Sequence, residues 1–310
     1  MKKFVILPDA FCELNKDLRQ EYDIDFVPSH IVKPNGEEVK LNLEWDFISH
    51  EDFYSSIKKD PSSYKTSPAS VGEYAEKFEA YVKQGIGVLS MSISTGLSGS
   101  YNFTLQAREL VMKKYPDAEI ECIDSLRYGP GYGLLAIYAS QLREEGKSLK
   151  ETAAWINENK NRFHQSGWLD DLTFVARKGR ITNAKAFFGQ LVGIKPVGEF
   201  DYNGLTTVIG NIKGEKAAYR ILLEYIAAEV ENPENQIMVI AQTDRLKQAE
   251  IFKTMIEERF HPKKIYICDV FPGCGVNVGP GLMSLYYMGK PISQGLVEER
   301  KLFESLTQKK

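Results

Sequence analysis

Ser94-Thr95-Gly96-Leu97-Ser98-Gly99-Ser100 is a polar, glycine-containing segment that joins an apolar run to a helical pattern. The apolar run, Gly87–Met91, has the length and composition of a buried β-strand, and Tyr101–Lys114 follows as a helix. A strand, a short loop and a helix form the repeating unit of a parallel α/β sheet. The segment therefore predicts an α/β structure in which this loop lies at the carboxyl end of a strand.

The same alternation extends over the first half of the chain. The pattern predicts strands at Phe4–Leu7, Phe26–Val32, Gly87–Met91 and Ile120–Ile123. It predicts helices at Glu13–Tyr22, His50–Lys59, Val71–Gln84, Tyr101–Lys114, Tyr132–Glu145 and Leu149–Lys160. Asn35-Gly36 indicates a hairpin, and Ser70 is placed to cap the helix that follows it. We expect a mainly parallel sheet with helices on both faces.

The second half has a different pattern. Strands are predicted at Ile194–Val197, Leu205–Ile209, Ile237–Ala241, Ile265–Val270 and Leu282–Tyr287. Helices are predicted at Leu172–Val175, Asn183–Leu191, Glu215–Val230, Arg245–Phe260 and Glu298–Lys310. Because some strands are joined by turns and others by helices, we expect a mixed sheet. The sequence thus predicts two α/β domains, residues 1–160 and 161–310, an ordinary count for 310 residues.

Composition restricts the classes of function. The net charge is -3, so the chain has no basic field for a nucleic acid. No run approaches the roughly 18 apolar residues of a membrane span, and the start lacks a signal-peptide pattern. The four cysteines include no CxxC pair. We expect a cytoplasmic protein with reduced thiols and no stable membrane insertion.

The loop at residues 94–100 has two interpretations. Its glycines allow a ligand close to the backbone, and the first amides of the following helix lack partners and favour an anion. Alternatively, the hydroxyls only cap the turn, which spacing alone favours. The same choice applies to Thr66 and Ser67 before the next predicted helix. These hydroxyls could bind a carboxylate or cap the helix.

Two further segments combine glycine with polar or apolar residues. Residues 177–183, Arg-Lys-Gly-Arg-Ile-Thr-Asn, could direct a guanidinium at a carboxylate or form a solvated basic loop. Residues 272–281, Pro-Gly-Cys-Gly-Val-Asn-Val-Gly-Pro-Gly, indicate constrained backbone near a ligand or a tight connection between domains. Residues 123–133 resemble a dinucleotide-binding turn only loosely, and helix–sheet packing explains their glycines equally well.

Motifs of catalysis and metal binding are absent from the sequence. There is no GxxxxGK[ST] and no GxSxG. The four histidines have no ligand-like spacing. We therefore expect no catalytic residue, no metal and no cofactor.

Taken in order, these segments resemble the DegV family of bacterial fatty-acid-binding proteins, which includes the FakB-type subunits of fatty acid kinase. The resemblance covers essentially the whole chain. Its landmarks are the residues 8–14 loop, Thr66-Ser67-Pro68, the residues 94–101 loop, Ile123-Asp124-Ser125, Lys178-Gly179-Arg180-Ile181 and Val278-Gly279-Pro280-Gly281.

The resemblance implies two α/β domains with one long-chain fatty acid between them, such as palmitate, stearate or oleate. Serine and threonine hydroxyls would hold the carboxylate, and an apolar tunnel would hold the acyl chain. The residues expected at the ligand are Thr66, Ser67, Ser94, Thr95, Gly96, Arg180 and Asn277. A fatty acid kinase catalytic subunit is the implied partner.

Two positions depart from the family pattern. The first loop usually contains Thr-Asp-Ser, where this chain has Pro8-Asp9-Ala10. Asn277 stands where the family commonly has histidine, and asparagine cannot become a cation at neutral pH. Both changes bear on the kinase reaction more than on lipid binding. The alternative functions are a serine-dependent acyl hydrolase or transferase using Ser94 or Ser98, and an interaction protein whose lipid controls docking.

Overall fold

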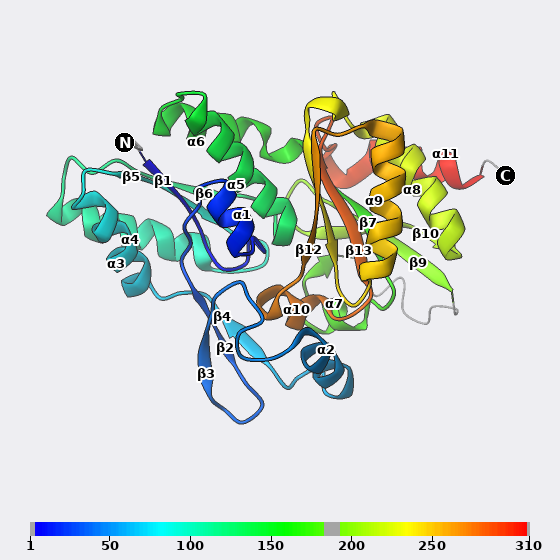
Figure 1. Cartoon of the computed structure of the whole chain (residues 1–310), viewed down its shortest axis with the longest axis horizontal. Helices are drawn as coiled ribbons and strands as arrows, with labels where there is room; N and C mark the ends of the chain where they lie inside the picture. Colours follow the sequence, from blue (N-terminus) through cyan, green and yellow to red (C-terminus); the bar gives the residue numbers. More distant parts are fainter. Residues whose placement is uncertain (1–3, 183–192, 309–310) are drawn as a thin grey trace.

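The computed structural model describes residues 4–182 and 193–308 (Figure 1). The helix expected at Asn183–Leu191 lies outside the described residues. Three sheets organise the fold, and they are ordered β1-β5-β6, β3-β2-β4 and β12-β11-β13-β7-β9-β10-β8.

The first sheet is parallel and is covered by helices on both faces, as predicted. Its strands are β1 (Phe4–Pro8), β5 (Gly87–Ser92) and β6 (Ile120–Asp124). Phe4 and Ile6 pack into the main core of the protein, whereas Val5 and Leu7 pack into a second core. This period of two follows from the pleat, because successive side chains leave a strand on opposite faces. The surrounding helices are α1 (Lys16–Glu21), α3 (Val71–Val82), α4 (Ser100–Lys114), α5 (Gly129–Glu144) and α6 (Leu149–Asn159).

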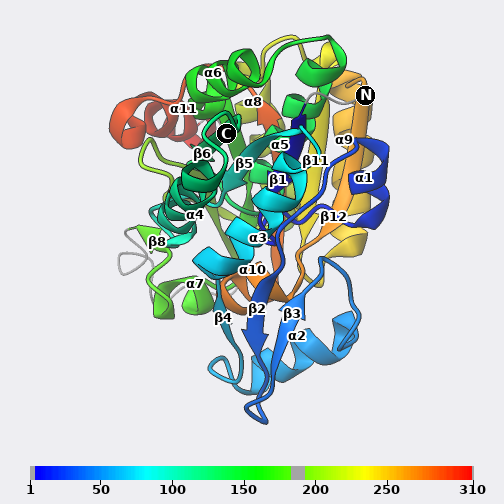
Figure 2. The ribbon, with the colours of Figure 1, turned by 90° about the vertical axis from the view of Figure 1, so that its left-hand side faces the viewer.

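The second sheet is a small antiparallel unit, which Figure 2 shows at the end of the molecule away from α6. Its strands are β2 (Ser29–Val32), β3 (Glu38–Leu41) and β4 (Lys65–Ser67), and α2 (His50–Lys59) lies beside it. The hairpin predicted at Asn35-Gly36 joins β2 to β3, and Gly36 has the positive φ of 84° that glycine tolerates best. Thr66 and Ser67, which precede the predicted helix at Val71–Gln84, belong to β4.

The third sheet is mixed, as the sequence predicts. Its strands are β7 (Phe163–Leu169), β8 (Ile181–Thr182), β9 (Ile194–Phe200), β10 (Thr206–Lys213), β11 (Ile237–Gln242), β12 (Lys264–Asp269) and β13 (Leu282–Met288). β11–β12 and β8–β10 pair in parallel, and the other pairs are antiparallel. The helices of this half are α7 (Thr173–Arg177), α8 (Glu215–Glu229), α9 (Leu246–Phe260), α10 (Pro272–Val278) and α11 (Val297–Gln308). Short 3-10 turns are Lys160–Arg162, Pro233–Asn235 and Gln294–Leu296.

Helix α5 lies between the parallel sheet and the mixed sheet (Figure 1). Its glycines let the helix pack closely against β13 on one side and against the residues after β1 on the other. A Cβ at Gly131 would lie 2.7 Å from the Tyr286 ring of β13, and one at Gly133 would collide with the carbonyl of Cys12. Helix–sheet packing therefore accounts for the glycines of residues 123–133. One hydrophobic core crosses α5, so the division at residues 160 and 161 stays a prediction, although the mixed sheet begins at Phe163.

Helix α10 was not predicted, because its sequence is dense in glycine and proline. Pro272 fits its first turn, where a backbone N–H is not needed. Gly275 leaves room for Phe53, which a Cβ would approach to 2.8 Å. Among the described helices, none has the length and apolar character needed to span a membrane.

Candidate functional site

A cavity of about 340 Å³ lies where the three sheets meet, and this volume falls within the roughly 300–1,000 Å³ of small-molecule sites. Its wall takes residues from β4, the loop before α4, the start of α5, β7, β9, β10, α10 and β13. Most of the lining side chains are apolar. They include Leu97, Leu169, Leu172, Val175, Ile181, Val208 and Leu282. Residues far apart in the sequence therefore share one apolar space.

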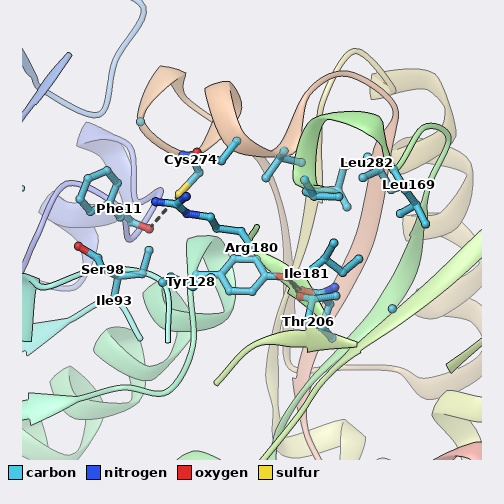
Figure 3. Close-up of a pocket in the computed structure, with 18 of the residues that line it drawn as sticks. Phe11, Ile93, Ser98, Tyr128, Leu169, Arg180, Ile181, Thr206, Cys274 and Leu282 are labelled. Carbon is cyan, nitrogen blue, oxygen red and sulfur yellow. Dashed lines mark hydrogen bonds between the residues drawn. The ribbon is translucent and has the colours of Figure 1, made fainter. Parts of the chain in front are cut away.

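Polar side chains occupy part of this wall. Thr66 and Ser67 come from β4, Ser98 and Gly99 from the loop before α4, and Asn277 from α10. Figure 3 shows Ser98 and Phe11 on one side of the cavity and Leu169 and Leu282 on the other. The cavity thus combines a hydroxyl-containing part with an apolar part.

Arg180 supplies positive charge to the cavity. Its side chain lines the cavity and extends toward Phe11 and Cys274 (Figure 3), while its guanidinium also donates a hydrogen bond to the Lys178 carbonyl. Partial burial, with the nearby charges of Arg180 and Lys65, lowers the pKa of Lys178. Among the described lining residues there is no aspartate, glutamate or histidine. The local field therefore favours an anion.

Helix α4 begins at this cavity. Gly99 is its N-cap, and no side chain caps the helix there. The Ser98 hydroxyl instead bonds the Ser100 hydroxyl at 2.9 Å. The Ser98 hydroxyl also accepts the Ser100 amide at 3.3 Å, and the other first-turn amides, together with the helix dipole, stabilise negative charge at such a terminus.

Three residues expected at the ligand lie outside the lining of this cavity. Ser94 is fully buried, its hydroxyl accepts the Gly96 amide at 3.1 Å, and it lies against Gly204. Thr95 is exposed and donates its hydroxyl to Asp124 at 2.6 Å. In this structure Ser94, Thr95 and Gly96 shape the turn, and Ser98 and Gly99 face the cavity. The chain turns back between residues 94 and 98, which spacing does not reveal, and the contact of Ser94, Thr95 or Gly96 with a ligand stays a prediction.

The remaining four expected residues, Thr66, Ser67, Arg180 and Asn277, all line the cavity. Sequence reasoning missed others in its wall. Besides Ser98 and Gly99, they include Phe11, Tyr128, Gln165, Thr206 and Cys274. Tyr128 lies in the glycine-containing segment at residues 123–133, but no local sequence pattern marks Gln165 or Thr206 as ligand-binding residues. Within the described residues, no group of three or more His, Cys, Asp or Glu could hold a metal ion.

The comparisons with known proteins agree with this architecture. The family model described as "Uncharacterised protein, DegV family" matches residues 3–290. The chain belongs to the DegV family. A DegV domain-containing protein of Clostridium perfringens is 34% identical over 93% of this chain and 98% of its own length.

Solved DegV structures share the fold. A DegV family protein from Thermus thermophilus, described by its fatty acid binding, aligns with a TM-score of 0.81 at 22% identity, over 93% of this chain and 100% of its own. A stearic-acid-binding protein from Eubacterium ventriosum aligns with a TM-score of 0.78 at 24% identity, over 93% of this chain and 98% of its own.

The DegV landmark at residues 8–10 contacts the backbone of residues that line the cavity. The Asp9 carboxylate accepts the amides of Phe11 at 3.1 Å and Ile93 at 3.3 Å, and both of these residues line the cavity. Complete burial raises the pKa of Asp9 to about 7. Asp9 therefore positions the wall of the cavity without facing it.

Proposed function

We propose that this protein binds one long-chain fatty acid non-covalently and acts as a carrier, without catalysing a reaction by itself. The observation that carries the proposal is an apolar cavity whose polar part has hydroxyls, a helix N-terminus and Arg180 but no described acidic residue. An acyl chain needs the apolar part, and a buried carboxylate needs the donors. The solved relatives described as binding fatty acids support the choice of ligand.

The energetics are sufficient for stable binding. A palmitoyl-sized chain buries about fourteen methylenes at roughly 0.8 kcal/mol each, which gives a gross gain on the order of 11 kcal/mol. Association and ordering oppose this by several kcal/mol. The acyl chain supplies the affinity in this arrangement. Thr66, Ser67, Ser98 and Arg180 orient the head group, with Asn277 beside them.

A serine hydrolase has no comparable support. Ser98 is the cavity serine of its loop, and its hydroxyl bonds Ser100. A nucleophilic serine needs an adjacent base, and the described lining contains no histidine or carboxylate. We place the carrier in the cytoplasm, where its four free cysteines would stay reduced.

The partner in this proposal is a fatty acid kinase that phosphorylates the bound carboxylate. Loaded protein mixed with such a kinase and ATP should consume ATP, and lipid-free protein should not. Equal ATP consumption with both forms would remove the kinase from the proposal and leave lipid binding intact.

The direct test is the lipid carried by the purified protein. Denaturing extraction followed by mass spectrometry should recover a saturated or monounsaturated long-chain fatty acid at near one-to-one stoichiometry. Lipid-free protein should rebind stearate or oleate in a titration. Recovery of no fatty acid, together with no rebinding of either lipid, would contradict the proposal.

A further inference from the structure

A second polar cluster, formed by Tyr128, Gln165 and Thr206, lies in the wall of the cavity. The Tyr128 hydroxyl donates to Oε1 of Gln165 at 2.6 Å and is also hydrogen-bonded to the Thr206 hydroxyl. Figure 3 shows the Tyr128 ring directed at Thr206, away from Ser98 on the opposite side. The cluster is therefore distinct from the part of the cavity assigned to the carboxylate.

One member of this cluster, the side-chain amide of Gln165, has N–H groups without an acceptor among the described residues. Tyr128 has one proton, and its bond to Gln165 leaves Thr206 as the donor to Tyr128. Nε2 of Gln165 then keeps two N–H groups, and within the described part of the chain nothing accepts them. Gln165 is only 5% exposed and Thr206 only 8%. The Gln165 side chain is mostly buried, but its amide nitrogen is not among the fully enclosed atoms that lack a partner, so it is open to the cavity and a ligand could pair with it.

The protein holds this cluster rigidly. The backbone N–H of Gln165 donates to the Glu199 carboxylate at 2.7 Å, and this hydrogen bond fixes the position of β7 beside the cluster. The Tyr128 ring packs edge-on against Phe200 with centroids 5.0 Å apart. Gly198 lies beside the cluster, where a Cβ would come within 2.8 Å of the Thr206 methyl and 3.4 Å of Nε2 of Gln165. The space next to the free amide is thus kept open by a glycine.

We propose that the cavity selects a long-chain fatty acid that carries a hydroxyl group part-way along its chain, and that Gln165 and Thr206 bind that hydroxyl. This inference rests on the proposed function and names its substrate class. A hydroxyl both donates and accepts, so it can accept from Nε2 of Gln165 and donate to Oγ1 of Thr206. A methylene leaves the Gln165 amide unpaired and the lone pairs of Thr206 unused. The cluster is neutral, so the carboxylate belongs with Arg180.

The test compares stearate, oleate and hydroxystearates whose hydroxyl occupies successive positions along the chain. One position, or two adjacent ones, should bind about three- to tenfold tighter than stearate, as one additional net hydrogen bond predicts. Gln165→Leu and Thr206→Val should each remove this preference and retain stearate binding. Thr207→Val is the matched control, because the Thr207 hydroxyl bonds Asp201 at 3.1 Å and is not in the cavity lining.

The outcomes separate the two proposals. Binding of stearate with no hydroxystearate favoured overturns this inference alone. Failure of every fatty acid to bind overturns the proposed function and this inference together. A third outcome is that the wild type prefers oleate over every hydroxystearate, and that Gln165→Leu and Thr206→Val keep that preference. This result would show that the cavity selects by chain shape, and it would overturn the inference of a hydroxyl-binding cluster. Thr206→Val gives an independent readout if Gln165→Leu does not fold.

Discussion

At the scale of single residues, two serines of one loop have different surroundings. Ser94 is fully buried and accepts the Gly96 amide, whereas Ser98 lines the cavity. The Ser94 hydroxyl supports the turn, because its loss leaves the Gly96 amide without its partner in the protein, whereas the Ser98 hydroxyl accepts the Ser100 amide at 3.3 Å and also lines the cavity. A hydroxyl in a cavity wall is available to a ligand.

Substituting these serines should therefore have separate effects. Ser98→Ala should weaken fatty acid binding by about 1 kcal/mol, and loss of its hydrogen bond with the Ser100 amide should lower the free energy of unfolding by no more than about 1 kcal/mol. Ser94→Ala should lower the free energy of unfolding by about 1–2 kcal/mol. Calorimetric titration and urea unfolding of both variants measure the two effects. The reverse assignment, with Ser94→Ala impairing binding alone, would place the ligand against Ser94.

Arg180 should contribute to affinity through its charge. Arg180→Ala should weaken binding of a fatty acid by about 1 kcal/mol, a modest value because the side chain is exposed and screened by solvent. The loss should diminish as salt concentration rises. Arg177→Ala is the matched control, since Arg177 is exposed at the end of α7 and absent from the cavity lining. Equal affinities for the two variants at low salt would show that Arg180 does not contact the head group.

At the scale of elements, the N-terminus of α4 combines a proposed carboxylate position with an unhindered glycine. Gly99 has a φ of -79°, which any residue adopts, and a Cβ there would meet nothing within 4 Å. Alanine at this position is therefore compatible with the fold. Its methyl group would enter the space in which a carboxylate approaches the first-turn amides.

Gly99→Ala should accordingly fold with a free energy of unfolding within about 1 kcal/mol of wild type, and it should bind fatty acid at least about tenfold more weakly, a loss of roughly 1.4 kcal/mol. Gly72→Ala on α3 is the control, because its Cβ would make only an ordinary contact, with the Ser70 hydroxyl at 3.9 Å, and Gly72 is not among the residues that line the cavity. Wild-type affinity in Gly99→Ala would exclude the helix N-terminus as the carboxylate position.

At the scale of the whole molecule, several buried titratable groups change its stability in the same direction. Burial raises the pKa of Glu13 from 4.5 to about 8 and that of Asp9 from 3.8 to about 7. Burial alone would lower the pKa of His164, but the Glu199 carboxylate 3.0 Å away raises it overall. Each raised pKa means that the folded protein binds more protons than the unfolded chain at intermediate pH. Stability must then fall as pH rises.

The free energy of unfolding should therefore decrease between about pH 5.5 and about pH 8.5, by at least about 1 kcal/mol. Carboxylates with lowered pKa values, such as Glu73 at about 2, are ionised in both states over this range and do not contribute. Urea unfolding at several pH values measures the slope. Glu13→Gln should flatten it, and Glu37→Gln, at an exposed carboxylate with a lowered pKa, should not. A stability that rises over this range would contradict the assignment.

The sequence by itself determined the elements and their class of fold. Alternating apolar and helical runs predicted a parallel sheet followed by a mixed one, and the Ser70 cap and the Asn35-Gly36 hairpin are present as predicted. These features depend on backbone hydrogen bonds and side-chain periods, which act over a few residues. Several of the landmark segments also contribute residues to the wall of the cavity.

Only the tertiary structure decided which side chains in those loops face the cavity. Ser98 replaces Ser94 there because the turn is fixed by Asp124 and Gly204, which are distant in sequence. The cluster of Tyr128, Gln165 and Thr206 forms only because α5, β7 and β10 converge on Phe200 and Gly198 of β9. Such contacts arise from packing between elements far apart in the chain, and no local sequence pattern encodes them.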